Sequence, residues 1–329
     1  MLRVRPPSRE SSFMHSSTAF RGRRGLLEAC ADDTKGQTCF ICTQALHWKT
    51  KEGLVRGCSC RGTAGFAHVS CLAEQAKILM DEVEDNNLSI KTFNERWPRW
   101  YKCSLCEQEY HGVVRCALGW ACWKTYVGRP ETNQTQRLAM SVLGNGLTAA
   151  GHDEDSLTVQ EARLSLMRRL EDSEGNILIV QTCLANSLMR LGRNEQASNM
   201  LRDIYSARVR LNGEEHRDTI IAALNYASSL GCLRRVEEVK SLLRKTIPAA
   251  RRVLGENNEI TLRVKLTYVT ALGLDTGATL DDVREAVTML EESKRTARRV
   301  LGSAHPLTTG FESNLRKARA ALRAREDSV

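Results

Sequence analysis

The pattern of apolar and polar positions changes character near residue 113. Between residues 113 and 126 the apolar residues follow helical spacing, and "GRP" at 128–130 indicates a break in regular structure. From residue 131 onward, apolar positions recur with a long period, which is typical of stacked repeats. The recurring residues are Leu188, Leu230 and Leu272 in one set of predicted helices, and Leu201, Leu243 and Leu290 in the other. The second half of the chain is therefore predicted to be all-helical.

The repeats are visible when the chain is compared with itself. "ANSLMRLGRNEQASNML" at 185–201 matches "ASSLGCLRRVEEVKSLL" at 227–243, an offset of 42 residues (185 to 227). The unit recurs toward the C-terminus, and a weaker first copy begins near Thr135 with its turn at Gly151. These matches predict about four helix-turn-helix units.

The boundary between units carries a motif of the form "LG-x2-H-P-x-T", clearest at residues 301–308. With this motif, the second half resembles the tetratricopeptide repeat in the longer form found in kinesin light chain. The resemblance implies a superhelix whose concave face binds peptides. Polar residues of the predicted first helices are the candidate peptide contacts: Asn186, Asn225, Ser228 and Thr267. An ordinary solvated surface is the open alternative for these residues.

One basic residue recurs at the end of each predicted second helix. The positions are Arg168, Arg210, Arg252 and Arg299. A cation in the last turn interacts favourably with the helix dipole, by roughly 0.3–1 kcal/mol. We favour this local role over the alternative, a basic ladder that binds an acidic partner.

Cysteine is concentrated in the first half of the chain. Seven of the twelve cysteines lie between residues 39 and 106. The chain starts without the apolar core of a secretory signal, which disfavours a disulfide framework. The other five cysteines show no pairing pattern; they are Cys30, Cys116, Cys122, Cys183 and Cys232.

The clustered cysteines form an ordered series of short pairs, C-x2-C, C-x-C, H-x2-C and C-x2-C. The eight residues are Cys39, Cys42, Cys58, Cys60, His68, Cys71, Cys103 and Cys106. A tight turn lets both donors of a pair reach one zinc ion at about 2.3 Å. Eight such ligands fill two closed tetrahedral sites, so the predicted cofactor is two structural zinc ions. Buried core cysteines beside a stray histidine are the alternative, and four ordered pairs argue against it.

This part of the chain resembles the RING-CH finger, the RING variant of the membrane-associated RING-CH ubiquitin ligases. The matching positions are Cys58, Cys60, Gly62, Thr63, Phe66, His68, Cys71 and Leu72, with "YKCSLCEQEY" at 101–110 as the end of the finger. The one-residue and seven-residue gaps favour this finger over a PHD finger. The resemblance implies a cross-brace, in which the first and third pairs hold one zinc and the second and fourth pairs hold the other.

The activity implied by the resemblance is ubiquitin ligation. The finger would bind a ubiquitin-conjugating enzyme loaded with ubiquitin, and no residue of this chain would be catalytic. Ile41 and Leu105 stand where such fingers contact the conjugating enzyme with apolar side chains. Gln75 and Glu107 depart from the pattern, since members of the family often carry Trp and a basic residue there. A carboxylate cannot donate the hydrogen bonds of a basic residue.

Composition adds three limits. The net charge is +9, from 48 basic and 39 acidic residues, which indicates a mixed surface and does not demand nucleic acid as a partner. Nucleic-acid binding is disfavoured because neither interleaved aromatic residues nor a concentrated basic patch is visible in the sequence. The apolar stretch at 113–123 is too short to span a bilayer. The first 35 residues are predicted to be a disordered basic tail, with an organelle transit peptide as the alternative. We therefore expect a protein without a membrane span, in the cytoplasm or the nucleus.

The predicted fold is a small zinc-stabilised α+β cross-brace finger followed by an all-α tetratricopeptide-repeat solenoid. The boundaries are 1–35 for the tail, 36–112 for the finger, 113–130 for a connecting helix and linker, and 131–325 for the repeats. The leading functional hypothesis is a ubiquitin-protein ligase whose repeats recruit a protein or peptide substrate. The alternative is a non-enzymatic interaction scaffold. A zinc-finger reader of nucleic acid is the third hypothesis, and only the basic pI supports it.

Overall fold

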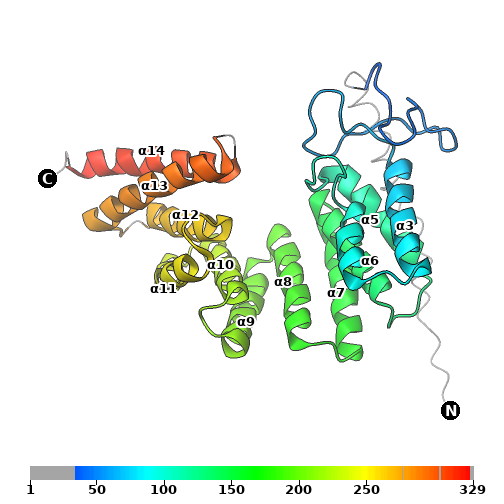
Figure 1. Ribbon diagram of the computed structural model, residues 1–329. Helices are drawn as coiled ribbons and strands as arrows, with labels where there is room; N and C mark the ends of the chain where they lie inside the picture. The colour runs from blue at the N-terminus through cyan, green and yellow to red at the C-terminus, as the bar shows by residue number, and fades with distance from the viewer. Residues whose placement is uncertain (1–33, 276, 304, 327–329) are drawn as a thin grey trace, which may run out of the picture. The chain divides into compact units, whose positions relative to one another are not determined.

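The computed structural model describes residues 34–275, 277–303 and 305–326 (Figure 1). By packing, the chain divides into two compact units, Met1–Glu171 and Asp172–Val329. The predicted tail lies outside the described residues, except for its last two positions. The four-part division expected from the sequence stays a prediction. Within the described ranges, no helix has both the length and the apolar character that crossing a membrane requires.

The first unit begins with loops and turns that carry the clustered cysteines. Two isolated antiparallel bridges, Val55 with Ala67 and Lys102 with Glu109, are its β component. The helices that follow are α3 (Val69–Asp85), α4 (Ile90–Arg96), the 3-10 helix η1 (Trp97–Trp100), α5 (Gly112–Tyr126), α6 (Gln134–Ala149) and α7 (Asp153–Arg169). The helix expected at 113–126 is confirmed as α5.

Helix α5 belongs to two cores at once. Val114 and Leu118 are buried in the cluster that surrounds the finger's cysteines. Toward α6, a Cβ on Gly119 would lie 3.0 Å from the Val142 carbonyl oxygen, and a Cβ on Gly146 would lie 2.8 Å from a carbonyl oxygen of α5. These glycines let the two backbones approach more closely than side chains would permit. The finger is therefore continuous with the helices that follow it.

Two tryptophans of η1 pack away from the cysteines. Trp97 and Trp100 are buried among Met80 of α3, and Cys122 and Tyr126 of α5. The Trp100 and Tyr126 rings meet edge to face, with centroids 5.8 Å apart. The "WPRW" segment therefore builds a helical core beneath the finger, because its rings turn toward α3 and α5.

The second unit is a row of antiparallel helix pairs. Its helices are α8 (Glu174–Arg190), α9 (Asn194–Asn212), α10 (Arg217–Cys232), α11 (Val236–Leu254), α12 (Glu259–Leu274), α13 (Leu280–Leu301) and α14 (Pro306–Glu326). Gly213, Gly255 and Gly302 end the second helix of each pair with positive φ, from 78° to 89°. Only glycine adopts this conformation without strain. The all-helical repeats predicted from the sequence are confirmed.

The threonine of the boundary motif has a structural role. Thr219 and Thr261 are buried, and their hydroxyls donate to the carbonyl oxygens of Arg208 at 3.2 Å and Ala250 at 3.3 Å. Thr308 donates to the Gly302 carbonyl oxygen at 2.8 Å. These carbonyls lie at or near the end of the preceding helix. The threonine therefore ties the first helix of one pair to the second helix of the pair before it.

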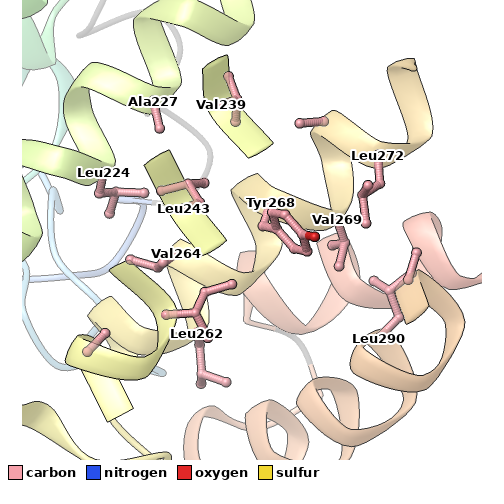
Figure 2. Packing of buried hydrophobic residues seen from close by; sticks show 14 of the residues in the cluster. Leu224, Ala227, Val239, Leu243, Leu262, Val264, Tyr268, Val269, Leu272 and Leu290 are labelled. Carbon is pink, nitrogen blue, oxygen red and sulfur yellow. The ribbon is translucent and has the colours of Figure 1, made fainter. Parts of the chain in front are cut away.

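The largest apolar cluster of the second unit lies between α10 and α14. Leu243, Tyr268 and Leu290 come from three successive helices and point into the same space (Figure 2). Tyr268 is fully buried, and its hydroxyl donates to Glu285 and accepts from Arg244. The apolar positions that recur in the sequence are thus the residues that join neighbouring pairs.

Candidate metal centre

Four predicted ligands meet in the first cluster: Cys39, Cys42, His68 and Cys71. Their ligand atoms all lie within 4.8 Å of one another. The Nδ1 of His68 faces the thiols, 3.3 Å from Cys42 Sγ and 3.5 Å from Cys71 Sγ. The Nε2 lies 3.3 Å from the Ala45 carbonyl oxygen. That carbonyl can hold the proton on Nε2, which leaves the Nδ1 lone pair directed at the thiols.

The second cluster contains Cys58, Cys60, Cys103 and Cys106, again with all ligand atoms within 4.8 Å. Cys60 Sγ and Cys103 Sγ are 3.8 Å apart, although 43 residues separate them. The two clusters therefore take alternate pairs along the chain. This is the cross-brace arrangement that the family resemblance implied.

The spacing of the donor atoms fits zinc. Tetrahedral zinc with Zn–S bonds of about 2.3 Å separates two sulfurs by about 3.8 Å. The Cys60–Cys103 separation equals that value, and it is far longer than the roughly 2.05 Å of a disulfide. Three thiols with an imidazole, and four thiols, are donor sets that favour zinc over harder cations. The residues present thus fit two closed structural sites.

The two C-x2-C turns have the same backbone structure. In the first, the Ile41 N–H donates to Cys39 Sγ at 3.4 Å and the Thr43 N–H donates to the Cys39 carbonyl at 2.8 Å. In the second, the Leu105 N–H donates to Cys103 Sγ at 3.4 Å and the Glu107 N–H donates to the Cys103 carbonyl at 3.0 Å. Each turn ends on a non-glycine residue with positive φ.

The pKa values of the thiols reflect their crowding. Burial and the neighbouring thiols raise the pKa of Cys60 and of Cys71. Burial also acts to raise the pKa of Cys106, but hydrogen bonds from backbone groups and nearby thiols outweigh it and lower this pKa to about 7. Thiols packed this closely cannot readily all be thiolates at once, because the negative charges repel one another unless a cation lies among them. A divalent metal would favour the thiolate form at every position.

The loop between the second and third pairs passes close to the second cluster. Gly65 has φ +84°, and a Cβ there would lie 2.5 Å from Cys60 Cβ and 3.2 Å from Cys58 Sγ. Gly62 also has positive φ, but a Cβ on it would meet nothing within 4 Å. Both glycines therefore sit in turns with positive φ, and only Gly65 is also constrained by space.

The predicted contact residues for a conjugating enzyme have different environments. Leu105 is 52% exposed, whereas Ile41 is half-buried in the matching turn. Gln75 is half-buried on α3. Glu107 is exposed, and its carboxylate forms an ion pair with Arg99 at 2.7 Å. Arg99 was missed by the sequence analysis, because no motif marks it and η1 alone brings it to Glu107.

The candidate peptide contacts lie on first helices of the second unit. Asn186 is exposed on α8, and Asn225 is half-buried on α10. The hydroxyls of Ser228 and Thr267 donate to carbonyls of their own helices, at 2.8 Å and 3.0 Å. These two hydroxyls can still accept a hydrogen bond, so the four residues stay a prediction.

The recurring arginines contact the start of their own helix pair. Arg210 pairs with Glu174, Arg252 pairs with Glu215 at 2.5 Å, and Arg299 bonds Asn257 at 3.0 Å. In the α6–α7 pair the matching contact is made by Arg169, with Glu131 at 2.5 Å, and not by Arg168. Each cation therefore links the two ends of one pair, which favours a local structural role over a ladder for a partner.

Comparison with known proteins agrees with this architecture. Residues 39–87 match the RING-variant domain, and residues 178–218 and 271–307 match the tetratricopeptide repeat. The chain thus has a RING-variant domain followed by tetratricopeptide repeats. The RING-variant match ends before Cys103 and Cys106, which the structure brings to the second cluster.

Several solved structures are similar in part. Two crystal structures of Podosopora anserina kinesin light chain-type, nearly identical TPR-like repeats are 15% identical, with 70% of this chain and 97% of those chains covered and TM-scores of 0.46 and 0.44. BtubC (BKLC) from P. vanneervenii is 13% identical, with 78% and 93% covered and a TM-score of 0.37. Among curated proteins, none matches the chain significantly.

Proposed function

We propose that this chain is a RING-type ubiquitin-protein ligase. Two structural zinc ions, held by the two Cys/His clusters, would fix the finger, which recruits a ubiquitin-conjugating enzyme. The helical repeats would recruit a protein substrate. The conjugating enzyme supplies the reactive thioester, so the chain contributes position and contact surface. We place this activity in the cytoplasm or the nucleus.

The observation that carries the proposal is that the two C-x2-C turns have matching structures. Both turns have the same hydrogen-bonded backbone, and each places an apolar residue, Ile41 or Leu105, between its two cysteines. An apolar side chain that is half exposed on a rigid turn is suited to contact with a partner. Metal held by the cysteines would make these turns rigid.

Ubiquitin discharge tests the proposal. The full chain is mixed with a panel of conjugating enzymes loaded with ubiquitin, and loss of the thioester to free lysine is followed. We expect acceleration with at least one enzyme, and we expect Leu105→Ala and Ile41→Ala to abolish it. Ile179→Ala is the matched control, because Ile179 is 49% exposed on the second unit and should not affect discharge.

The second candidate is a scaffold without ligase activity. The Arg99–Glu107 ion pair favours it, because a carboxylate stands where the family resemblance expects a basic ubiquitin contact. A full chain that holds two zinc ions but accelerates no enzyme of the panel would support the scaffold. Acceleration that survives both apolar substitutions would also contradict the proposed docking surface.

A further inference from the structure

One segment near the C-terminus is rich in basic residues and poor in acidic ones. Between residues 293 and 325 there are nine basic residues and one acidic residue, Glu312. Over the whole of the two helices that contain this segment, Leu280–Leu301 and Pro306–Glu326, there are ten basic and seven acidic residues, so the acidic residues lie mainly outside it. The segment comprises the second half of α13 and nearly all of α14, which run side by side at the end of the second unit (Figure 1).

An ion pair fixes how these two helices face each other. Arg319 of α14 contacts Glu291 of α13 at 2.7 Å. Residues three, four or seven positions apart lie on the same side of a helix. On α13, Lys294, Arg295 and Arg298 follow Glu291 at three, four and seven positions. They therefore lie on the side of α13 that meets Arg319.

The same rule applies to α14. Arg316 lies three positions before Arg319, and Arg323 lies four positions after it. Both therefore share the side that meets Glu291. Six cations from two helices thus line one surface, which we call the basic face: Lys294, Arg295, Arg298, Arg316, Arg319 and Arg323. The same spacing places Glu291, Glu312 and Glu326 on this surface, which leaves an excess of three positive charges.

Most of these cations form no hydrogen bond or ion pair within the described part of the chain. Of the six, Arg319 alone has a side-chain hydrogen bond or an ion pair among the described residues. Its partner Glu291 has a pKa below the ordinary value, chiefly because of Arg319, with Arg295 and Lys294 contributing. Elsewhere in the second unit cations are commonly paired, as Lys240 is with Asp275 at 2.8 Å. The basic face is therefore an unbalanced surface and not a solvated network of ion pairs.

We propose that the basic face binds an acidic protein segment, one with a run of Asp and Glu side chains. Five of its six cations are arginines, and a guanidinium pairs with a carboxylate through two parallel hydrogen bonds. The α14 row runs from Arg316 to Arg323, roughly 10 Å at 1.5 Å per residue. That length accommodates a few carboxylates of one extended peptide, at about 3.3 Å per residue.

The observations favour a peptide over nucleic acid. The one aromatic residue of α13 and α14 is Phe311, which is fully buried, so the basic face offers no ring on which a base could stack. The basic face is separate from the candidate peptide contacts on α8, α10 and α12. Binding of an acidic segment there does not depend on the proposed ligase activity.

Fluorescence anisotropy with the full chain tests the proposal. The probes are a labelled peptide of alternating Glu and Gly, the same peptide with Gln in place of Glu, and a labelled DNA duplex of equal net charge. One variant combines Arg295→Gln, Arg298→Gln, Arg316→Gln and Arg323→Gln. The charge-matched control combines four exposed cations elsewhere on helices: Lys91→Gln, Lys124→Gln, Arg217→Gln and Lys245→Gln.

We expect the Glu peptide to bind, the Gln peptide not to bind, and the basic-face variant to weaken binding by about tenfold or more. The control variant should stay within about twofold, and circular dichroism should show equal helix content in both variants. Equal losses in the two variants would mean that net charge alone attracts the peptide, and the proposal would fail. It would also fail if the Glu peptide does not bind, or if the duplex binds more tightly than the Glu peptide.

Discussion

The guanidinium of Arg99 holds the carboxylate of Glu107 at 2.7 Å and also donates to the Cys103 carbonyl oxygen at 3.1 Å. Glu107 follows the last cysteine of the finger, and it has φ +56°. The acidic residue at this position is therefore part of the structure of the second C-x2-C turn. Its charge is partly balanced by a cation that comes from η1.

This contact makes Glu107 a test of the finger's activity. On the proposed function, Glu107→Arg should raise the rate of ubiquitin discharge by about threefold or more, because a guanidinium donates hydrogen bonds that a carboxylate cannot. Discharge is measured with the conjugating enzyme that the wild-type chain accelerates. Glu195→Arg in the second unit makes the same charge change and should have no effect. A slower rate with Glu107→Arg would show that the ion pair with Arg99 supports the active turn.

Metal removal should unfold part of the chain. We expect two zinc ions per chain by elemental analysis, and each structural site contributes on the order of 10 kcal/mol to folding. Cys58→Ser should lose the metal of the second cluster, whereas Cys232→Ser, at an exposed position outside both clusters, should lose none. A chelator should unfold the finger while the helices of the second unit keep their circular dichroism. Metal contents that are equal in the two serine variants would argue against the second site.

The two glycines after the C-x-C pair should respond differently to substitution. In Gly62→Ala the added Cβ meets no other atom, but alanine is strained at positive φ. We expect this substitution to lower the free energy of unfolding by about 1 kcal/mol. Gly65→Ala adds a Cβ 2.5 Å from Cys60 Cβ, so it should cost more than about 2 kcal/mol and weaken zinc binding. Competition with a colorimetric chelator reads out zinc affinity. Equal zinc affinity in both variants would contradict the close approach at Gly65.

The buried threonine hydroxyls should contribute to repeat stability. Thr261→Val keeps the shape of the side chain but leaves the Ala250 carbonyl oxygen without this donor, and we expect a loss of about 1–2 kcal/mol. Urea unfolding followed by circular dichroism measures it. Thr267→Val is the control, because that hydroxyl is partly exposed and donates within its own helix, so about 0.5 kcal/mol or less is expected. A similar loss of unfolding free energy in Thr267→Val would argue against a special role of the buried threonine in joining helix pairs.

Stability of the second unit should fall in acid partly through Asp275. The pKa of Asp275 lies below its ordinary value of 3.8 because Lys240 donates to the carboxylate. The unfolded chain therefore binds protons at higher pH than the folded chain does. The contribution is present above pH 3.8 and is lost as the pH falls through the folded pKa. Asp275→Asn should flatten this part of the pH dependence of urea unfolding, whereas Asp281→Asn, at a carboxylate 91% exposed, should not.

The sequence predicts the finger well, because zinc ligands come as short pairs with limited spacing. Which pairs meet at each cluster was implied by the family resemblance and not by the spacing, so the grouping of His68 with Cys39 depended on that resemblance. The helix at 113–126 and the helix pairs also follow from local apolar spacing. The boundary motif at residues 301–308 includes Thr308, although it does not say what the threonine hydroxyl contacts.

Other features depend on how the helices pack, which no local pattern encodes. Arg99 meets Glu107 only because η1 turns the guanidinium back toward the second cluster. In the α6–α7 pair a shift of one position brings Arg169 to Glu131, although the repeat register marked Arg168. The net charge of the chain did not indicate the basic face, because the six cations come together only when α13 and α14 pack side by side.

The double burial of α5 determines how this protein can be dissected. A fragment that stops at residue 112 would strip Val114 and Leu118 from the finger, and one that stops after α5 would leave Gly119 with no backbone to pack against. Both faces of α5 are covered only when α6 is included, and the compact unit that contains both helices runs to Glu171. Fragments that lack α6 should aggregate or misfold when they are joined to other proteins.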